Sequence, residues 1–565
     1  MNAALVPAVD WLGRYERRWL KADVLAGLTT AAVVIPKAMA YATIAGLPVE
    51  VGLYTVLVPT AVYAALGTSR VLSVSTSTTL GILCASALGA AVPHAEPAAL
   101  LTASATLAVL VGAILLLARL LRLGFVANFI SDPVLTGFKA GVGLVIVLDQ
   151  APKLLGVHYD KVGFVRDAAS LVRHVPETSI PTLVVGLTTL AVVVGLEHLA
   201  PRAPSPLLAV GGGIAAVYLL GLQSTGVAVV GHIPGGLPAP VRPDVSLLEA
   251  LWPAAVGIAL MSFTETIAAG RAFVAPGEPR PRPNQELVAT GAANLVGGLF
   301  GAMPGGGGTS QTAVNRKAGA VTQLAALVTS AAALAALLFL APVLGLLPQA
   351  TLAAVVIVFS VGLISPDGFR EIQGFRAQEF LWALVACGGV VLLGTLRGIV
   401  AAVVLSMLTL LYMANNPPVY VMGRKRGTDA FRPYSPEHPD DEFFPGLLIL
   451  RTEGRVYFGN AQNIGDRIWP LVREAKPKVL LVDCGGIPGF EFTALKMLVE
   501  AEEKLREEGV ELWLAALSPE ALRLVQGSTL GERLGREKMF FTLAQAVDRY
   551  VTRTGAPPPG RGSTP

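Results

Sequence analysis

A series of apolar segments, each close to the length that crosses a lipid bilayer, constrains this sequence more than any other feature. They follow one another from Val24 to about Ala414, separated by short breaks that carry Pro, Gly or charged residues. A transmembrane helix needs about 20 mainly apolar residues, and several of these segments are shorter. The pattern predicts a polytopic α-helical membrane protein of about fourteen segments. They begin near Val24, Val51, Thr76, Pro97, Pro133, Ile180, Ser205, Ser246, Gln285, Ser310, Ala320, Gln349, Gln378 and Arg397.

Charged residues divide the chain into two physically different parts. They make up 15% of the whole sequence, but they are scarce before residue 417 and reach the roughly 25% of a soluble protein after it. In the charged part, predicted strands alternate with amphipathic helices, which is typical of an α/β domain. The strands are predicted over Leu447–Phe458, Val479–Gly485 and Glu511–Leu517, and the helices over Ala461–Ala475, Phe492–Val510, Ser518–Gly535 and Leu543–Thr552.

These patterns give five expected regions. They are an N-terminal segment over 1–22, a transmembrane domain over 23–416, a linker over 417–442, the α/β domain over 443–553 and a disordered tail over 554–565. Basic residues precede the first span and follow the last one, so the positive-inside rule places both chain ends in the cytoplasm. The basic residues are Arg14, Arg17, Arg18, Lys21, Arg424, Lys425 and Arg426.

Several classes of function are disfavoured by composition. A net charge of +4 is small for 565 residues, and no basic stretch carries interleaved aromatic residues, so nucleic-acid binding is not expected. The cysteines, Cys84, Cys387 and Cys484, are far apart and lack zinc-ligand spacing. We find no cofactor motif and no pairing of a nucleophile with a base, so an enzyme is not expected.

Two apolar segments are interrupted at corresponding places in the two halves of the membrane part. Gly67–Thr79 is rich in Ser and Thr, Gly301–Asn315 contains four consecutive glycines, and a short helix is expected after each break. Non-helical backbone at membrane depth is tolerated only where it is buried in protein or lines a cavity. Paired broken helices of this kind indicate the substrate site of a transporter.

The two short helices are expected to begin near Ser75–Ser77 and near Ser310–Thr312. Their unpaired N–H groups and positive dipole ends would form an anion site if they converge. The alternative is that both breaks are surface loops between spans. A phosphate-binding loop is disfavoured, because no Gly-Lys-Ser/Thr follows the glycines and Lys317 comes after the motif.

Ionisable residues inside spans are costly, and they are therefore candidates for function. Lys37 follows Pro36, which is expected to break the first span near its middle. Glu265 lies inside the eighth span, with the hydroxyl residues Ser262, Thr264 and Thr266 around it. Burial favours the protonated form of a carboxyl group in general, which suits a proton carrier, and a carboxylate beside hydroxyls suits sodium. A structural ion pair, or side chains that reach to the interface, is the alternative.

At these residues the sequence resembles the SulP family of anion transporters, over about Leu20 to Arg549. Six motifs in the family's order carry the resemblance: Pro36–Ala42, Ala45–Tyr54, Gly67–Arg70, Glu265–Phe273, Asn284–Leu287 and Ser310–Asn315. The resemblance implies two inverted repeats of seven segments, a core domain that rocks against a gate domain, and a homodimer in membrane lipid. It also implies a substrate between the third and tenth segments. The expected substrate-binding residues are Lys37, Tyr41, Ser75, Thr76, Ser77, Gly308, Thr309, Ser310, Gln311 and Thr312, and the expected coupling-ion residues are Glu265, Ser262 and Thr266.

Two residues depart from the family pattern. Position 37 is usually Gln in this family, and position 311 is often Arg in its animal members, where it supplies positive charge to the anion. Here these residues are Lys37 and Gln311. Our hypothesis is that Lys37 supplies the attraction that Gln311 cannot.

The C-terminal part resembles STAS domains, with Val479–Gly485 as a strand and Gly489–Leu495 at the start of a helix. In regulatory relatives a phosphorylatable Ser occupies the position of Phe492, so a phospho-switch is not expected there. Thr493 is a possible acceptor, although a Thr at a helix start is more often a cap or a packing residue. We expect a regulatory or assembly element on the cytoplasmic side.

The leading hypothesis is a secondary active transporter of the bacterial inner membrane. It would carry a small anion, such as sulfate, bicarbonate or a dicarboxylate like fumarate, together with protons or sodium and by alternating access. A nucleobase permease of similar architecture is one alternative, but Lys37 and the STAS-like tail disfavour it. A membrane sensor that signals through the tail is another, and it leaves the paired broken helices without a role.

Overall fold

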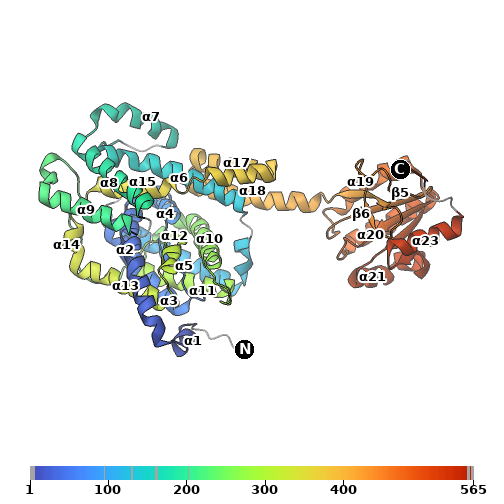
Figure 1. Ribbon diagram of the computed structural model, residues 1–565, viewed down its shortest axis with the longest axis horizontal. Coiled ribbons are helices and arrows are strands. Elements are labelled where there is room, and N and C mark those ends of the chain that lie inside the picture. Colours follow the sequence, from blue (N-terminus) through green and yellow to red (C-terminus); the bar gives the residue numbers. More distant parts are fainter. Residues whose placement is uncertain are drawn as a thin grey trace. The chain divides into compact units, whose positions relative to one another are not determined.

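The chain forms two compact units, Met1–Ser406 and Met407–Pro565. The computed structural model describes residues 7–93, 96–128, 131–159, 163–200, 203–555 and 560–561. The first unit is helical and the second contains a mixed sheet with helices, as Figure 1 shows for each. Among the described residues, eight helices are long and apolar enough to span a membrane by length and composition.

Each of the fourteen predicted segments corresponds to a helix. These helices are α2 (Leu20–Ile44), α3 (Val49–Leu66), α4 (Thr78–Ala91), α5 (Pro97–Leu120), α6 (Asp132–Leu155), α8 (Ile180–Leu199), α9 (Ser205–Leu220), α10 (Leu248–Ala272), α11 (Pro283–Leu299), α12 (Thr309–Lys317), α13 (Leu324–Ala335), α15 (Gln349–Val361), α17 (Ala377–Leu393) and α18 (Thr395–Asn415). Shorter helices are α1 (Pro7–Gly13), α7 (Phe164–His174), α14 (Ala341–Leu344) and α16 (Pro366–Phe375), and a π-helical turn, Ala336–Leu340, connects α13 to α14.

The helices of the first unit pack as two groups. In one group, α11 packs on α3 and α5, α13 packs on α2 and α3, and α10 packs on α4 and α5. In the other, α6 packs on α15 and α17, and α8 packs on α15 and α9. We call them the core group (α2–α5 and α10–α13) and the gate group (α6, α8, α9, α15 and α17). Fewer contacts join the groups, and those that do involve mainly α2 with α9 and α15.

The expected break of the first span at Pro36 is wrong. α2 is one continuous helix of 25 residues with Pro36 buried in its interior. Proline removes a single backbone hydrogen bond, and close packing by neighbouring helices sustains such a helix within a membrane protein. Lys37 therefore lies on an uninterrupted helix.

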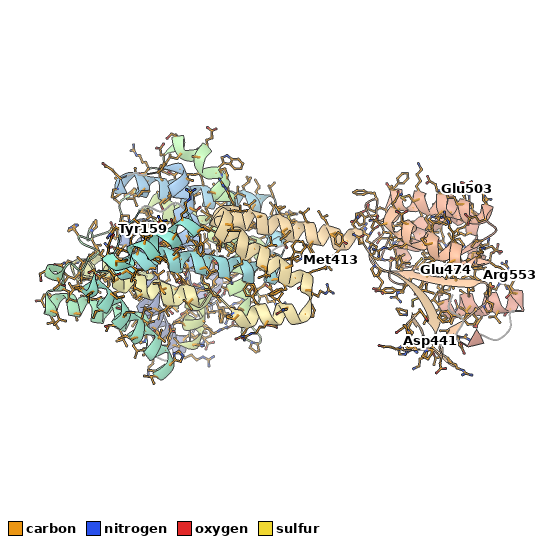
Figure 2. The ribbon with its side chains drawn as sticks, turned by 90° about the horizontal axis from the view of Figure 1, so that it is seen from above. Tyr159, Met413, Asp441, Glu474, Glu503 and Arg553 are labelled. Carbon is orange, nitrogen blue, oxygen red and sulfur yellow. The ribbon has the colours of Figure 1, made fainter. Side chains whose placement is uncertain are left out.

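The second unit is an eight-stranded sheet with helices on both faces. The strand order is β10–β5–β3–β6–β7–β8–β9, with β4 paired to β3; strands β6 to β9 are parallel, and β3 is antiparallel to β6. α19 to α22 cover one face and α23 covers the other, and their side chains fill the space against the sheet (Figure 2). The strands are β3 (Val419–Arg424), β4 (Phe431–Pro433), β5 (Glu442–Phe443), β6 (Leu447–Thr452), β7 (Val479–Asp483), β8 (Glu511–Ala515), β9 (Met539–Phe540) and β10 (Gly560–Arg561), and the helices are α19 (Ala461–Ala475), α20 (Phe492–Glu507), α21 (Pro519–Gln526), α22 (Thr529–Leu534) and α23 (Leu543–Thr554).

The region expected to be a linker, 417–442, is instead part of the sheet of the second unit. β3 and β4 lie within it, and Val419 and Val421 pair with Thr452 and Leu450 of β6. Val419–Met422 has the β-branched and aromatic character of a strand, which the flanking prolines and charges obscured. Of the tail expected to be disordered, 556–559 and 562–565 lie outside the described residues, while Gly560–Arg561 pairs with β5.

Candidate functional site

The two interrupted segments meet in the core group. Their extended residues form a two-stranded antiparallel ribbon of β1 (Val74–Ser75) and β2 (Gly306–Gly307), in which Val74 pairs with Gly307 and Ser75 with Gly306. α4 follows β1 and α12 follows β2. Because the strands are antiparallel, the two helices leave the ribbon in opposite directions, so their N-terminal ends face each other across it. The alternative that both breaks are surface loops is wrong, since all four ribbon residues are buried.

The two helix starts are built differently. Ser77 is the N-cap of α4, and its hydroxyl accepts a hydrogen bond from the Leu80 N–H at 3.2 Å. Gly308 precedes α12 without a side-chain cap. The first N–H groups of a helix lack partners inside the helix and carry a partial positive charge. Two such ends at one ribbon suit an anion.

Lys37 reaches the start of α12 from α2. Its ammonium donates a hydrogen bond to the Ser310 hydroxyl at 3.3 Å and lies 3.9 Å from the centre of the Phe359 ring of α15. Lys37 is only 5% exposed, whereas Ser310 is exposed. A cation from the core group thus lies at an accessible helix start and against an aromatic ring of the gate group.

Gln311 and Thr312 tie the two breaks together. The Gln311 amide donates to the Ser73 carbonyl at 2.9 Å, and its oxygen accepts from the Ser75 hydroxyl at 3.0 Å. The Thr312 hydroxyl accepts from the Ser73 N–H at 3.1 Å and donates to the Gly308 carbonyl at 2.7 Å. These side chains use their polar groups to hold the ribbon in register.

Glu265 lies at the other helix start. Its carboxylate accepts a hydrogen bond from the Ser77 hydroxyl at 2.8 Å. Ser262 and Thr266, expected beside this carboxylate, bond instead to the backbone of the second break: Ser262 donates to the Gly305 carbonyl at 2.6 Å, and the Gly307 N–H donates to Thr266 at 2.9 Å. The structure therefore brings Glu265 to Ser77 and gives the two α10 hydroxyls a supporting position.

The other predicted residues lie around the same ribbon. Tyr41 is 6% exposed and neighbours Thr78 at the start of α4. Thr76, 1% exposed, has a buried hydroxyl without a hydrogen-bond partner among the described residues. Thr309, at the first position of α12, is exposed. An unpaired buried hydroxyl is costly, so Thr76 is a ready donor for a bound ligand.

The glycine run allows the second break to approach α10 closely. A Cβ atom at Gly307 would lie 2.7 Å from the Thr266 Cα, and one at Gly306 would lie 2.9 Å from the Ser262 hydroxyl. Real side chains do not tolerate these distances. Gly306 and Gly307 thus allow close packing of the backbone against α10.

A buried carboxylate was missed as a structural anchor. Glu286 of α11 is fully buried and accepts hydrogen bonds from the Tyr63 hydroxyl at 2.6 Å, from the Thr68 N–H at 2.8 Å and from the Thr68 hydroxyl. It fixes the start of the first break, Gly67–Thr79, to the second half. The motif Asn284–Leu287 was the available signal, but the sequence showed no partner for it.

Asp23 makes a matching contact at the opposite half. This buried carboxylate at the start of α2 accepts hydrogen bonds from the Val321 and Thr322 N–H groups at 2.8 and 3.0 Å and from the Thr322 hydroxyl at 2.6 Å. From sequence alone, a charged residue near the end of a span is expected to lie at the membrane boundary. Asp23 is instead buried and caps the backbone N–H groups of Val321 and Thr322.

The second unit presents the predicted STAS helix start at α20. Phe492 is 84% exposed and Thr493 is also exposed, while Glu491 occupies the N-cap position. The expected cap or packing role of Thr493 is therefore wrong, because its side chain does neither.

Both units match models of known protein families. The model of the "Sulfate permease family" matches residues 20–386, and that of the "STAS domain" matches residues 438–546. A "Probable sulfate transporter MT1781" of Mycobacterium tuberculosis is 34% identical over 556 residues, which cover 98% of this chain and 99% of the relative.

Solved structures show the same fold. The murine Slc26a9 anion transporter in the inward-facing state has a TM-score of 0.87 at 22% identity, over 97% of this chain and 94% of that one. The transmembrane domain of the cyanobacterial bicarbonate transporter BicA has a TM-score of 0.60 at 23% identity, over 69% and 98%. The relatives are transporters rather than enzymes, which confirms that expectation. The chain belongs to the sulfate permease family of membrane anion transporters and carries a C-terminal STAS domain.

Proposed function

We propose that this chain carries sulfate across a bacterial membrane by alternating access, with the anion held between the N-terminal ends of α4 and α12. The observation that supports this best is the β1–β2 ribbon, which places two helix N-termini on either side of one point. Sulfate is the first candidate because the bacterial relative, matched over nearly its whole length, is named as a probable sulfate transporter. Bicarbonate and fumarate are the other candidate substrates that the family resemblance suggests.

Lys37, Ser310 and Thr76 are the proposed anion contacts. Lys37 supplies a full positive charge, the exposed Ser310 hydroxyl lies 3.3 Å from that charge, and the Thr76 hydroxyl lacks a partner among the described residues. Gln311 has a different proposed role, because its amide already holds Ser73 and Ser75. The positive charge of the site therefore comes from α2.

Glu265 is the proposed site of coupling to a cation. It bonds directly to Ser77, the cap of α4, which is one of the two helices between which the anion would bind. A proton or a sodium ion on this carboxylate would change that bond, and the change would reach the anion through α4. Binding of the cation would thus favour binding of the anion, as symport requires.

The proposed setting is the inner membrane of a bacterium, with both chain ends in the cytoplasm and the chain as a homodimer. The basic residues around Arg17 and Lys425 support this orientation by the positive-inside rule. The STAS domain would then lie in the cytoplasm, where we assign it a regulatory or assembly role.

Uptake of labelled anions into proteoliposomes tests the proposal. We expect sulfate to enter, and to accumulate when an inward gradient of pH or sodium is imposed. Glu265→Gln should abolish gradient-driven accumulation yet leave sulfate exchange measurable, because the anion contacts stay in place. Accumulation by Glu265→Gln at the wild-type level contradicts the coupling role. A panel with bicarbonate and fumarate identifies the substrate if sulfate does not enter.

A further inference from the structure

A cavity of about 420 Å³ lies where the core and gate groups meet, away from the β1–β2 ribbon. The core group contributes the end of α2 and the start of α3, from Thr43 to Glu50, and the gate group contributes Lys153 of α6 with Gln349 and Leu352 of α15. Val230, His232 and Pro234, from the segment between α9 and α10, complete the lining. A small oxyanion with several waters fits this volume, since one water occupies about 30 Å³.

The cavity is in line with the proposed anion site. Thr43 lies about 9 Å further along α2 than Lys37, and Leu352 lies about 10 Å along α15 from Phe359, at 1.5 Å of rise per residue. The Lys37–Phe359 contact joins the same two helices. α2 and α15 therefore contact each other at Lys37 and Phe359, and both line the cavity about two helical turns away.

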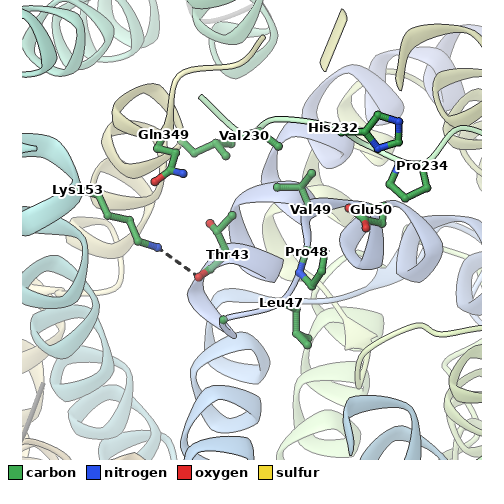
Figure 3. Close-up of a pocket in the computed structure, with 12 residues that line it drawn as sticks. Thr43, Leu47, Pro48, Val49, Glu50, Lys153, Val230, His232, Pro234 and Gln349 are labelled. Atoms are coloured by element: carbon green, nitrogen blue, oxygen red, sulfur yellow. Dashed lines mark hydrogen bonds between the residues drawn. The ribbon is translucent and has the colours of Figure 1, made fainter. Parts of the chain in front are cut away.

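Lys153 spans the two groups inside this cavity. Its ammonium donates a hydrogen bond to the Thr43 carbonyl at 3.3 Å, at the last turn of α2, as Figure 3 shows. Figure 3 also shows Glu50 and His232 on the side opposite Lys153 and Gln349. A lysine is a compact charge on a flexible stem with three donors, so its ammonium can bind an anion in addition to a carbonyl.

We propose that this cavity is a second anion site at the outer end of the transport path, where Lys153 binds the anion before it passes to Lys37. The inference rests on the proposed function and adds a residue and a place to it. A negative charge on the opposite wall, Glu50, repels the anion and directs it toward Lys153. The ligand class is a small inorganic oxyanion, with sulfate as the probe.

Sulfate influx in right-side-out membrane vesicles tests the role of Lys153. We expect Lys153→Gln to raise the KM for external sulfate at least fivefold while kcat changes less than twofold, and Lys153→Arg to stay near wild type. Glu50→Gln should lower the KM. Lys317→Gln is the matched control, because this exposed lysine ends α12, near the start of α2, and is far from the cavity. If Lys153 only caps α2, its loss would reduce kcat or the amount of folded protein and leave the KM unchanged.

A charge-restoring reagent separates charge from packing. In Lys153→Cys, a membrane-impermeant thiol reagent that adds a positive group should restore the low KM, and one that adds a negative group should not. External sulfate should slow both modifications. Wild type treated in parallel controls for the native thiols, of which Cys84 and Cys484 are buried.

Three outcomes overturn the inference. An unchanged KM in Lys153→Gln removes the second site while wild-type uptake keeps the proposed function. Equal effects of the two reagents show that only bulk matters. Failure of the wild type to take up any of the three anions contradicts the proposed function itself, and with it this inference.

Discussion

The two helix starts at the ribbon occupy corresponding places in the two halves, yet their chemistry is opposite. At α4, Ser77 bonds to the carboxylate Glu265 of α10; at α12, Ser310 bonds to the ammonium of Lys37 on α2. α2 and α10 are both 25 residues long, and Lys37 and Glu265 occupy the same position counted from the start of each. The halves therefore place one cation and one anion at equivalent points.

In the proposed function, this difference lets a symmetric frame bind two different ions. An inverted repeat gives two equivalent helix starts, and both favour anions by their dipoles. Lys37 strengthens that preference at one start, whereas Glu265 opposes it at the other and favours a cation. In the proposed function, the anion would lie nearer α12 and the coupling cation nearer α4.

Loss of Lys37 should have the largest effect. Removal of one partner of a buried charged contact costs about 2 kcal/mol or more, which corresponds to about a 30-fold loss. We expect Lys37→Gln to lower the kcat/KM of sulfate uptake by about that factor. Gln311→Ala should change it by less than about threefold, because Gln311 holds the ribbon rather than the anion. Equal, small effects of both changes would refute the assignment of the cation.

A cation placed on α12 should restore the function that Lys37→Gln loses. The double variant Lys37→Gln with Gln311→Arg recreates the combination common in animal members of the family. We expect it to recover roughly tenfold in kcat/KM over Lys37→Gln alone, since the positive charge returns to the same helix start. Gln311→Lys in the same background provides a second geometry. A double variant no better than the single one indicates that Lys37 acts through packing.

Gly307, in the second strand of the β1–β2 ribbon, should tolerate little increase in side-chain size. A methyl group at Gly307 would press on the Thr266 backbone at 2.7 Å, and overpacking of this kind costs about 1–3 kcal/mol. We expect Gly307→Ala to lower the melting temperature of the purified protein and to slow uptake severalfold. Gly89→Ala in α4 is the control, because nothing lies within 4 Å of its added methyl group. Equal behaviour of the two variants argues against close ribbon packing.

An ion pair of the STAS domain should have the smallest effect. The Arg553 side chain, by hydrogen bonding, lowers the pKa of Glu511 to about 2, and Lys538 lies 3.6 Å from the same carboxylate. A lowered pKa stabilises the fold above the unfolded value of about 4.3, and that contribution is lost as the pH falls toward 2. Because the pair is partly solvated, Glu511→Gln should cost less than about 1 kcal/mol at pH 7 and leave sulfate uptake unchanged.

Melting curves from pH 7 down to pH 3 measure this contribution. The difference in melting temperature between wild type and Glu511→Gln should shrink with the pH. A difference that grows instead contradicts the sign. Glu511→Gln should therefore leave sulfate uptake at the wild-type level, whereas Lys37→Gln, inside the membrane part, should lower its kcat/KM about 30-fold.

Much of the site could be predicted from residue type alone. Paired interruptions by Ser, Thr and Gly within otherwise apolar segments identified both helix starts, because polar backbone is so costly at membrane depth. Lys37 and Glu265 were evident for the same reason. β3 was assigned to the linker because prolines and charged residues surround it. The continuity of α2 at Pro36 was missed because packing by neighbouring helices, rather than the proline, decides it.

Residue types alone show which segments are apolar, where they are interrupted and which ionisable residues they contain. The contacts between these groups are visible only in the folded chain: Lys37 meets Ser310, Glu265 meets Ser77, Gln311 meets the first break, and Lys153 meets the end of α2. The physical reason is that hydropathy is a property of each segment alone, whereas these contacts depend on how helices far apart in the chain pack. The sequence shows which hydroxyl and amide donors are present, but only the fold shows which acceptors they bond.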